Sequence, residues 1–528
     1  MQKAKVVNLS KGMIESAIKK GAGKLAGGAL LLAKTCEETM NRNEIILKYC
    51  LYIACFFVLA PILFTLQDIW DGRVVFAAFH AEDMTILKKW FTQYRWDLQY
   101  YMYLSFDWMQ NLTGLSYKLW ANIVSCASLL GIAFEVNRLM RDELKLEREY
   151  CLLGVLTILV FPPWATLMSS VLTFHISCIW AFLLAVRFRN SFPIIALPLF
   201  VYSLSLHSIF AFAVGYAVFN GVMTVDKSNW KMVGRHVVLI SLGLVTIFAA
   251  YRHFFPPLGL HASYNGFNPR WIGFLNYAVI AMSVAAFTRF VLARNESQEE
   301  RQVLYRRVLA CLILLFFAGL AYWYVGRPIK VEGTNSFTPR HAYLTSIPMA
   351  MLVALLSQYG ARRLGKKIAY TLVGAVLLLS FFYQFAAFQQ KYTQLLYEDI
   401  LLMKMKDIET PAPGIIYIDS KRKQTPKYIR DFCGLKWAFV ERFGQDVWHI
   451  KVCTDKPGCT IPDVEKKKVG QYLVETSGTK ASDLKVTRLV LLLDNFDAFG
   501  NPLYYYYYYS KDYERFNPRL EIVGVEEY

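Results

Sequence analysis

The sequence predicts an all-α polytopic membrane protein with a small α/β domain at its C-terminal end. Three observations predict this class: apolar runs of spanning length between residues 46 and 388, connecting loops that alternate between dense and sparse positive charge, and a change to mixed sequence after residue 388. A bilayer core needs about 20 apolar residues per helix, or about 17 at the short end. The mean hydropathy of +0.30 and the 16% of aromatic residues fit such a protein.

Seven runs are long and apolar enough to be single spans. Two longer stretches, 151–186 and 191–223, are interrupted, the first by Pro162 and Pro163 and the second at 203–208. Each is either two short helices or one kinked helix, so the sequence predicts about eleven spans, or nine if both stretches are single. The seven simple runs are 46–66, 119–136, 237–252, 272–292, 308–325, 341–358 and 368–388.

Positive charge predicts the orientation. Five short loops carry 17 Lys and Arg in 52 residues, whereas three other loops carry 10 in 86. Since loops rich in Lys and Arg stay in the cytoplasm, we expect a cytoplasmic N-terminus and an extracytoplasmic tail. The expected inside loops are 137–149, 187–190, 226–236, 293–307 and 359–367, and the expected outside loops are 67–118, 252–270 and 326–340.

The N-terminal segment, residues 1–45, is basic and has an amphipathic pattern. This predicts a helix on the anionic inner leaflet, or alternatively a helix that docks a partner. The net charge of +18 would favour a nucleic-acid partner in a soluble protein. Here the cytoplasmic loops account for much of that charge, so we expect membrane lipids as partners and no nucleic acid.

The first outside loop, 67–118, is too long for a simple connector. Its sequence predicts two helices, at about 83–94 and 96–111, with a wide aromatic face. Such helices are typical of the membrane interface. They either anchor the protein as an aromatic belt or roof a cavity at the membrane surface.

The tail, 389–528, begins with a helix that leaves the membrane at 389–410. Residues 415–419 and 489–494 have the pattern of buried strands, and 424–433 that of a helix between them. We interpret the tail as a small α/β domain. The run of tyrosines from 504 to 509 is interpreted as a further strand.

The tail also holds three cysteines, Cys433, Cys453 and Cys459. Disulfides are permitted outside the cytoplasm, so a Cys453–Cys459 bond or a bond from Cys433 is expected. No metal-binding Cys or His spacing occurs in the sequence, and we expect no metal site.

Four acidic residues of the first outside loop are candidate catalytic groups: Asp68, Asp71, Glu82 and Asp83. Asp68 and Asp71 are three residues apart, so on a helical turn both face the same way. A carboxylate beside a membrane cavity can act as a general base towards a sugar hydroxyl. The alternative is that Asp68 caps the next helix and the others are solvated.

Four residues of the late outside loop form a basic cluster: Arg327, Lys330, Arg340 and His341. Positive charge in an outside loop is unusual under the insertion rule. Such cations suit a lipid phosphate, which Arg holds with a bidentate fork. The alternative is contact with anionic headgroups, with His341 capping a helix.

The architecture resembles bacterial integral-membrane glycosyltransferases of the GT-C fold, of the kind encoded among O-antigen and capsule functions. The residues that carry the resemblance are Asp71-Gly72-Arg73, Glu82-Asp83 and the aromatic run at 90–101. The resemblance implies an inverting transfer from a polyprenyl-phosphate sugar donor to a glycan or lipid-linked acceptor. It also implies a place in the bacterial inner membrane.

By the same resemblance Asp71 is the expected catalytic base, and Asp83 and Asp68 are the alternative candidates. A cofactor is not expected, although dependence on a divalent cation stays open. The residues expected to bind substrate or its phosphate are Arg327, Lys330, Arg340, His341 and Glu82.

Three other functions fit the same pattern of spans. An O-antigen polymerase or ligase would act on a pyrophosphate-linked glycan and would have outside loops richer in Arg. A lipid-linked-glycan transporter or flippase would show charges at mid-membrane, inverted repeats or paired broken helices. A non-catalytic scaffold would act through its exported tail.

Overall fold

The computed structural model is mostly helical and confirms the all-α polytopic membrane class. Within its described residues, eight helices are long and apolar enough to cross a membrane, or nine if a pair bent by 49° is one span. The residues described are 42–69, 72–80, 82, 84–93, 97–226, 228–254, 269, 271–293, 296–327, 329, 338–420, 439–440, 442–443, 448–454, 463–494, 496 and 503–527. The amphipathic pattern predicted before residue 42 lies outside them.

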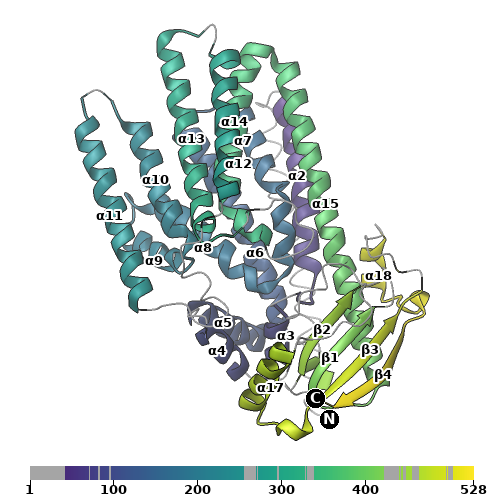
Figure 1. Ribbon diagram of the computed structural model, residues 1–528. Helices are drawn as coiled ribbons and strands as arrows, with labels where there is room; N and C mark the ends of the chain where they lie inside the picture. Colours follow the sequence, from purple (N-terminus) through teal and green to yellow (C-terminus); the bar gives the residue numbers. More distant parts are fainter. Residues whose placement is uncertain are drawn as a thin grey trace. The chain divides into compact units, whose positions relative to one another are not determined.

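Every apolar run predicted as a span coincides with a helix. The helices, labelled in Figure 1, are α2 (Arg42–Phe64), α6 (Tyr117–Asp142), α7 (Arg148–Leu159), α8 (Thr173–Phe188), α9 (Pro193–Leu204), α10 (Ser208–Thr224), α11 (Trp230–Phe254), α12 (Trp271–Phe287), α13 (Gln298–Tyr324), α14 (Ser346–Leu364) and α15 (Lys366–Lys404). A π-helical turn, η4 (Thr288–Leu292), extends α12.

Both interrupted stretches fold as two helices each. Between α7 and α8 lie two short 3₁₀ helices, η1 (Pro162–Met168) and η2 (Ser170–Leu172). We call residues 162–172 the break segment. Two prolines open η1, and proline there ends the preceding helix because it lacks an N–H donor. The helices α9 and α10 have 12 and 17 residues, which is short for a span.

Burial divides the spans into an inner and an outer group. In the span that ends with α14, 83% of the apolar window is buried, whereas the corresponding share in α11 is 6%. After His236 the exposed side chains of α11 are mostly apolar, among them Val238, Leu242 and Val245. A face of this kind is stable only in contact with lipid or another apolar surface.

The first long loop forms three helices, α3 (Gly72–His80), α4 (Met84–Gln93) and α5 (Asp97–Thr113). The two predicted helices are confirmed as α4 and α5, and α3 is additional. The aromatic residues of this loop do not share one face. Phe91, Tyr103 and Phe106 are buried in a core with α3, whereas Tyr101 and Trp108 are exposed.

The C-terminal part contains a four-stranded sheet in the order β2-β1-β3-β4. The strand β1 pairs in parallel with β2 and β3, and β4 pairs antiparallel with β3. The two predicted strands are confirmed as β1 and β3, and the helix predicted at 424–433 lies outside the described residues. The elements are β1 (Gly414–Ser420), β2 (Trp448–Thr454), α17 (Asp463–Ser477), β3 (Lys485–Leu492), α18 (Tyr504–Ser510) and β4 (Arg519–Glu527), with short helices η6 (Met405–Asp407), η7 (Ala481–Asp483) and η8 (Glu514–Phe516).

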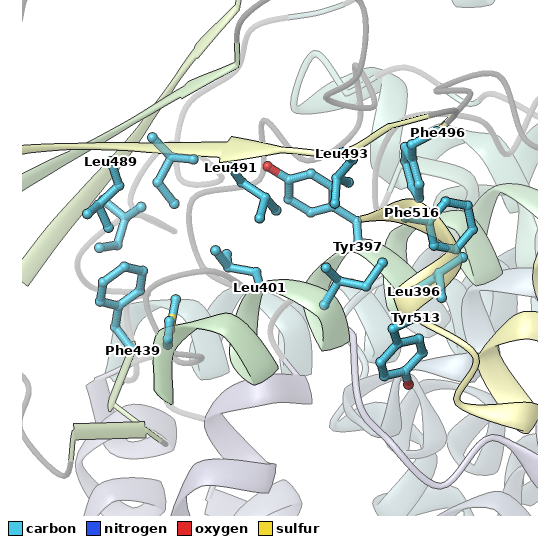
Figure 2. Packing of buried hydrophobic residues seen from close by; sticks show 14 of the residues in the cluster. Leu396, Tyr397, Leu401, Phe439, Leu489, Leu491, Leu493, Phe496, Tyr513 and Phe516 are labelled. Carbon is cyan, nitrogen blue, oxygen red and sulfur yellow. The ribbon is translucent and has the colours of Figure 1, made fainter. Parts of the chain in front are cut away.

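The helix α15 runs without a break from the apolar run into the C-terminal core. Its 39 residues correspond to a length of about 58 Å. Leu396, Tyr397 and Leu401 of its last turns pack with Leu489 and Leu491 of β3, as Figure 2 shows. One face of the sheet is therefore covered by the helix that crosses the membrane.

The other face of the sheet is covered by α17. In β1, Ile416 and Ile418 belong to the α15 core, whereas Ile415 and Tyr417 pack with Leu473 of α17. This alternation is the two-residue period of a strand that is buried on both sides.

The prediction of a strand at 504–509 was wrong, because these residues form the helix α18. Tyr504, Tyr507 and Tyr508 are buried and follow helical spacing, whereas the tyrosines between them are exposed. A run of identical residues has no periodicity from which helix and strand can be told apart. The side chains of the three tail cysteines lie outside the described residues.

Candidate functional site

Asp68 is fully buried in the short segment between α2 and α3. Its Oδ2 accepts a hydrogen bond from the Tyr117 hydroxyl at 2.8 Å. Its Oδ1 accepts from the backbone N–H of Ser170 at 2.7 Å and from Nζ of Lys118 at 3.3 Å. Both carboxylate oxygens are therefore held by donors from α6 and from the break segment.

The buried ammonium group of Lys118 joins this carboxylate to the break segment. Besides its bond to Asp68, Nζ donates to the carbonyl oxygen of Met168 at 2.6 Å. The hydroxyl of Ser169 donates to the carbonyl oxygen of Ile69 at 3.0 Å. The carbonyl oxygen of Met168 and the hydroxyl of Ser169, both in the break segment, thus form hydrogen bonds with residues of the first loop.

Gly72 begins α3 directly beside this network. A Cβ at this position would lie 2.8 Å from Oγ of Ser169 and 2.6 Å from Cγ of Asp68. Contacts this short do not occur in real side chains, so the close approach of α3 to Asp68 needs glycine.

A second buried ion pair fixes α3 to α15. Nη2 and Nε of Arg73 donate to Oε2 of Glu398 at 2.9 and 3.1 Å. The exposed fractions of the two side chains are 0% and 1%. Gln394, one turn earlier in α15, donates to the other carboxylate oxygen at 2.8 Å. A buried pair needs such additional bonds to offset its desolvation.

The C-terminal module also contacts the start of the first loop. The Tyr508 hydroxyl of α18 donates to Oε1 of Gln67 at 3.3 Å. Asp399, next to the buried ion pair, accepts from Nζ of Lys511 at 2.8 Å and from the Tyr513 hydroxyl at 2.6 Å. Burial, and next the negative charge of Asp399, raise the pKa of Tyr513, so this phenol keeps its proton and donates.

The late basic loop reaches the break segment from another direction. Its 3₁₀ helix η5 (Thr338–Thr345) holds a buried His341, which stacks on Tyr322 with ring centroids 4.4 Å apart. Tyr343 shares a hydrogen bond with Thr166 of η1 and packs on the ring of Trp164.

The break segment therefore brings together the two loops that the sequence marked as candidates. The acidic loop contacts it through Asp68, and the basic loop contacts it through Tyr343. Arg340 is the third residue of η5, and Arg327 follows α13; both are half-buried. Glu82 is exposed, with a φ of 53°, and its side chain has no hydrogen bond to the described residues of this cluster. Asp71, Asp83 and Lys330 lie outside the described residues.

Lys118 and Glu398 are the members of the cluster that the sequence reasoning missed. Lys118 was visible as an ionisable residue at the edge of the apolar run 119–136, which is a functional signal in a membrane protein, whereas Glu398 lies ten residues beyond the run 368–388. Their partners lie far away in the sequence, since Arg73 and Glu398 are 325 residues apart.

Three further buried polar groups gather at the break segment: Oε1 of Gln99, the hydroxyl of Tyr103 and Oγ of Ser170. Within the described residues none of these atoms makes a hydrogen bond of good geometry, but the Tyr103 hydroxyl lies close enough to interact with both Ser170 and Gln99. The amide nitrogen of Gln99 donates to the carbonyl oxygen of Val171 at 2.9 Å, which holds α5 on the break segment. Acceptors and hydroxyls of this kind can bind a polar group.

The described residues contain no group of three or more His, Cys, Asp and Glu side chains that could hold a metal ion. No family model, curated protein or solved structure matches the chain.

Proposed function

We propose that the protein is an inverting membrane glycosyltransferase. It moves a sugar from a polyprenyl-phosphate donor to a glycan or lipid-linked acceptor on the extracytoplasmic side, in the assembly of a bacterial surface polysaccharide. The observation that carries the proposal is the meeting of the acidic and the basic loop at the break segment. A transferase of this type needs a base and a phosphate-binding group within reach of one sugar.

The proposed reaction assigns a role to each loop. Asp71 takes the proton of the acceptor hydroxyl, whose oxygen forms a bond to the anomeric carbon while the bond to the lipid phosphate breaks. Arg340, Arg327 and Lys330 hold the phosphate that leaves. Asp68 is three residues from Asp71, and its three donors make it a positioning residue.

Burial supports a functional role for this cluster. Two buried ion pairs, Asp68 with Lys118 and Arg73 with Glu398, lie close to the ends of apolar helices. Removing charges from water is expensive, and ionisable groups at such places are functional candidates by default. The proposed location is the bacterial inner membrane, with a cytoplasmic N-terminus, an extracytoplasmic C-terminus and about eleven spans, or nine.

Transfer of radiolabelled sugar from a panel of polyprenyl-phosphate sugars tests the proposal. We expect the purified wild-type protein to transfer from one donor, also in the presence of a chelator. Asp71→Asn should lower kcat by about 10²- to 10⁴-fold, the usual contribution of a general base. Arg340→Gln should raise KM for the donor. Asp142→Asn, half-exposed at the far end of α6, is the matched control and should transfer normally.

The 49° bend between α7 and η1 favours a transporter as the second candidate. Transporters bind substrate at discontinuous helices of this kind. If the wild-type protein transfers sugar from no donor, yet moves a lipid-linked glycan across liposomes, the transporter replaces the transferase.

A further inference from the structure

The helix α18 carries tyrosines on two faces. Tyr504 and Tyr507 are buried in the C-terminal core, and Tyr508 is buried against Tyr392 of α15. The other three, Tyr505, Tyr506 and Tyr509, are 45%, 57% and 45% exposed. Three large aromatic side chains exposed on one short helix need a surface to contact.

The position of α18 along the axis of α15 indicates which surface the exposed tyrosines contact. The exposed apolar side chains of α15 extend from Ile368 to Phe385, about 26 Å along the axis, close to the roughly 30 Å of a bilayer core. Tyr392 lies about 10 Å further on, at the outer edge of the headgroup region, which extends about 5–8 Å beyond the core on each side. The rings of Tyr508 and Tyr509 pack on Tyr392 with centroids 5.9 and 5.8 Å away. The helix α18 accordingly lies beside α15 (Figure 1).

A second span, α2, independently places α18 at the same level, just beyond the apolar part of the span. The apolar helix α2 ends at Phe64, and Phe64 and Leu66 are both exposed. Gln67 follows immediately and accepts the hydrogen bond of Tyr508. The helix α18 thus contacts the first residues beyond the apolar parts of two different spans.

We propose that α18 is an interfacial element whose exposed tyrosines rest in the phospholipid headgroup region around the end of the bundle that contains Asp68. Tyrosine suits this region because its ring is apolar and its hydroxyl is polar. The next residues contribute no net charge, since Lys511 and Arg515 are balanced by Asp512 and Glu514. Contact is therefore with zwitterionic and anionic lipid alike. This inference does not depend on the proposed function.

Photocrosslinking of the full-length protein in nanodiscs tests the proposal. p-Benzoylphenylalanine replaces Tyr506, and radiolabelled phosphatidylcholine reports covalent attachment to lipid. The matched control places the same group at Val525, which is 59% exposed on β4 of the same module. We expect several-fold more lipid attached at 506 than at 525, and the same excess when part of the lipid is anionic.

Equal labelling at the two positions would overturn the proposal. So would lipid attachment at 506 that disappears when an excess of soluble polysaccharide is added, because the tyrosines would then be a platform for sugars. Placing p-benzoylphenylalanine at Tyr509 provides a second test position, in case the substitution at Tyr506 disturbs the local structure. It is expected to give the same excess of attached lipid over position 525.

Discussion

The ion pairs at the two ends of α6 differ in how far their members are exposed to solvent. Lys118 is the second residue of the helix, and Glu135 lies 17 residues later, about 26 Å along the axis. At the Asp68 end, both members of the pairs Asp68–Lys118 and Arg73–Glu398 are buried, with exposed fractions of 0–1%, whereas Lys511, which pairs with the neighbouring Asp399, is 53% exposed. At the Glu135 end, each ion pair of the described residues has at least one accessible partner. These pairs are Arg138–Glu135, Arg138–Asp142, Arg187–Glu135, Arg362–Glu147 and Lys366–Glu149.

The difference separates two uses of charge. An accessible ion pair contributes about 0–1 kcal/mol to stability and forms readily at a membrane surface. A buried pair loses several kcal/mol of hydration per ion and is rarely the most stable solution. Stability alone therefore explains the Glu135 end, whereas the Asp68 end needs a further reason, which we take to be function.

Breaking a buried pair should have the largest effect. Lys118→Met leaves the carboxylate of Asp68 buried without its cation and should destabilise the protein by about 3–5 kcal/mol. The thermal unfolding midpoint in detergent measures this loss. Lys366→Met is the matched control, because Lys366 is 55% exposed, and its midpoint should fall far less. Equal losses in the two variants would remove the distinction between the two ends.

A side chain that clashes with Asp68 should have the next largest effect on stability. Gly72→Ala introduces a Cβ against the Asp68 carboxyl group and Ser169 and should cost about 1–3 kcal/mol. Gly243→Ala in α11 meets nothing within 4 Å and should leave the unfolding midpoint unchanged or higher. A stable Gly72→Ala protein would mean that α3 does not approach Asp68 as closely as described.

The hydrogen bond between Tyr513 and Asp399 should contribute about 1 kcal/mol, which Tyr513→Phe removes. Because the folded pKa of Tyr513 is raised, this contribution is complete below about pH 10, the ordinary tyrosine pKa, and is lost as pH rises through the raised value. Unfolding measured from pH 7 to 11 should show a constant difference between wild type and variant that shrinks only at the alkaline end. A difference that disappears at neutral pH would contradict this assignment.

An accessible pair at the Glu135 end should matter least. Arg362→Ala removes an ion pair whose members are 48% and 54% exposed, so stability should change by less than about 1 kcal/mol. The same unfolding assay measures it, with Arg362→Lys as the control. A loss as large as that of Lys118→Met would show that burial does not decide the contribution.

The spans could be predicted because hydrophobic runs are local signals. Even the two interrupted stretches were marked, by Pro162 and by the polar residues around Ser203, although the sequence left their count open. The tyrosine run was misread, because six identical residues carry no period and only packing on α15 makes them a helix.

The candidate site could be predicted only in part. The sequence marked the acidic and the basic loop, but not that both meet at the break segment. Nor could it pair Arg73 with Glu398, because contact between residues 325 apart depends on how the helices pack. Asp68, an alternative candidate for the catalytic base, accepts hydrogen bonds at both of its carboxylate oxygens.

The most direct test compares Glu398→Gln with Glu135→Gln, recording sugar transfer and the unfolding midpoint on the same preparations. Both glutamates are 1% exposed and both bind arginine, but they lie at opposite ends of the bundle. We predict that both variants lose stability and that only Glu398→Gln loses transfer beyond what its lower midpoint explains. If transfer follows the midpoint equally in both, the Asp68 end has no special role and the account is wrong.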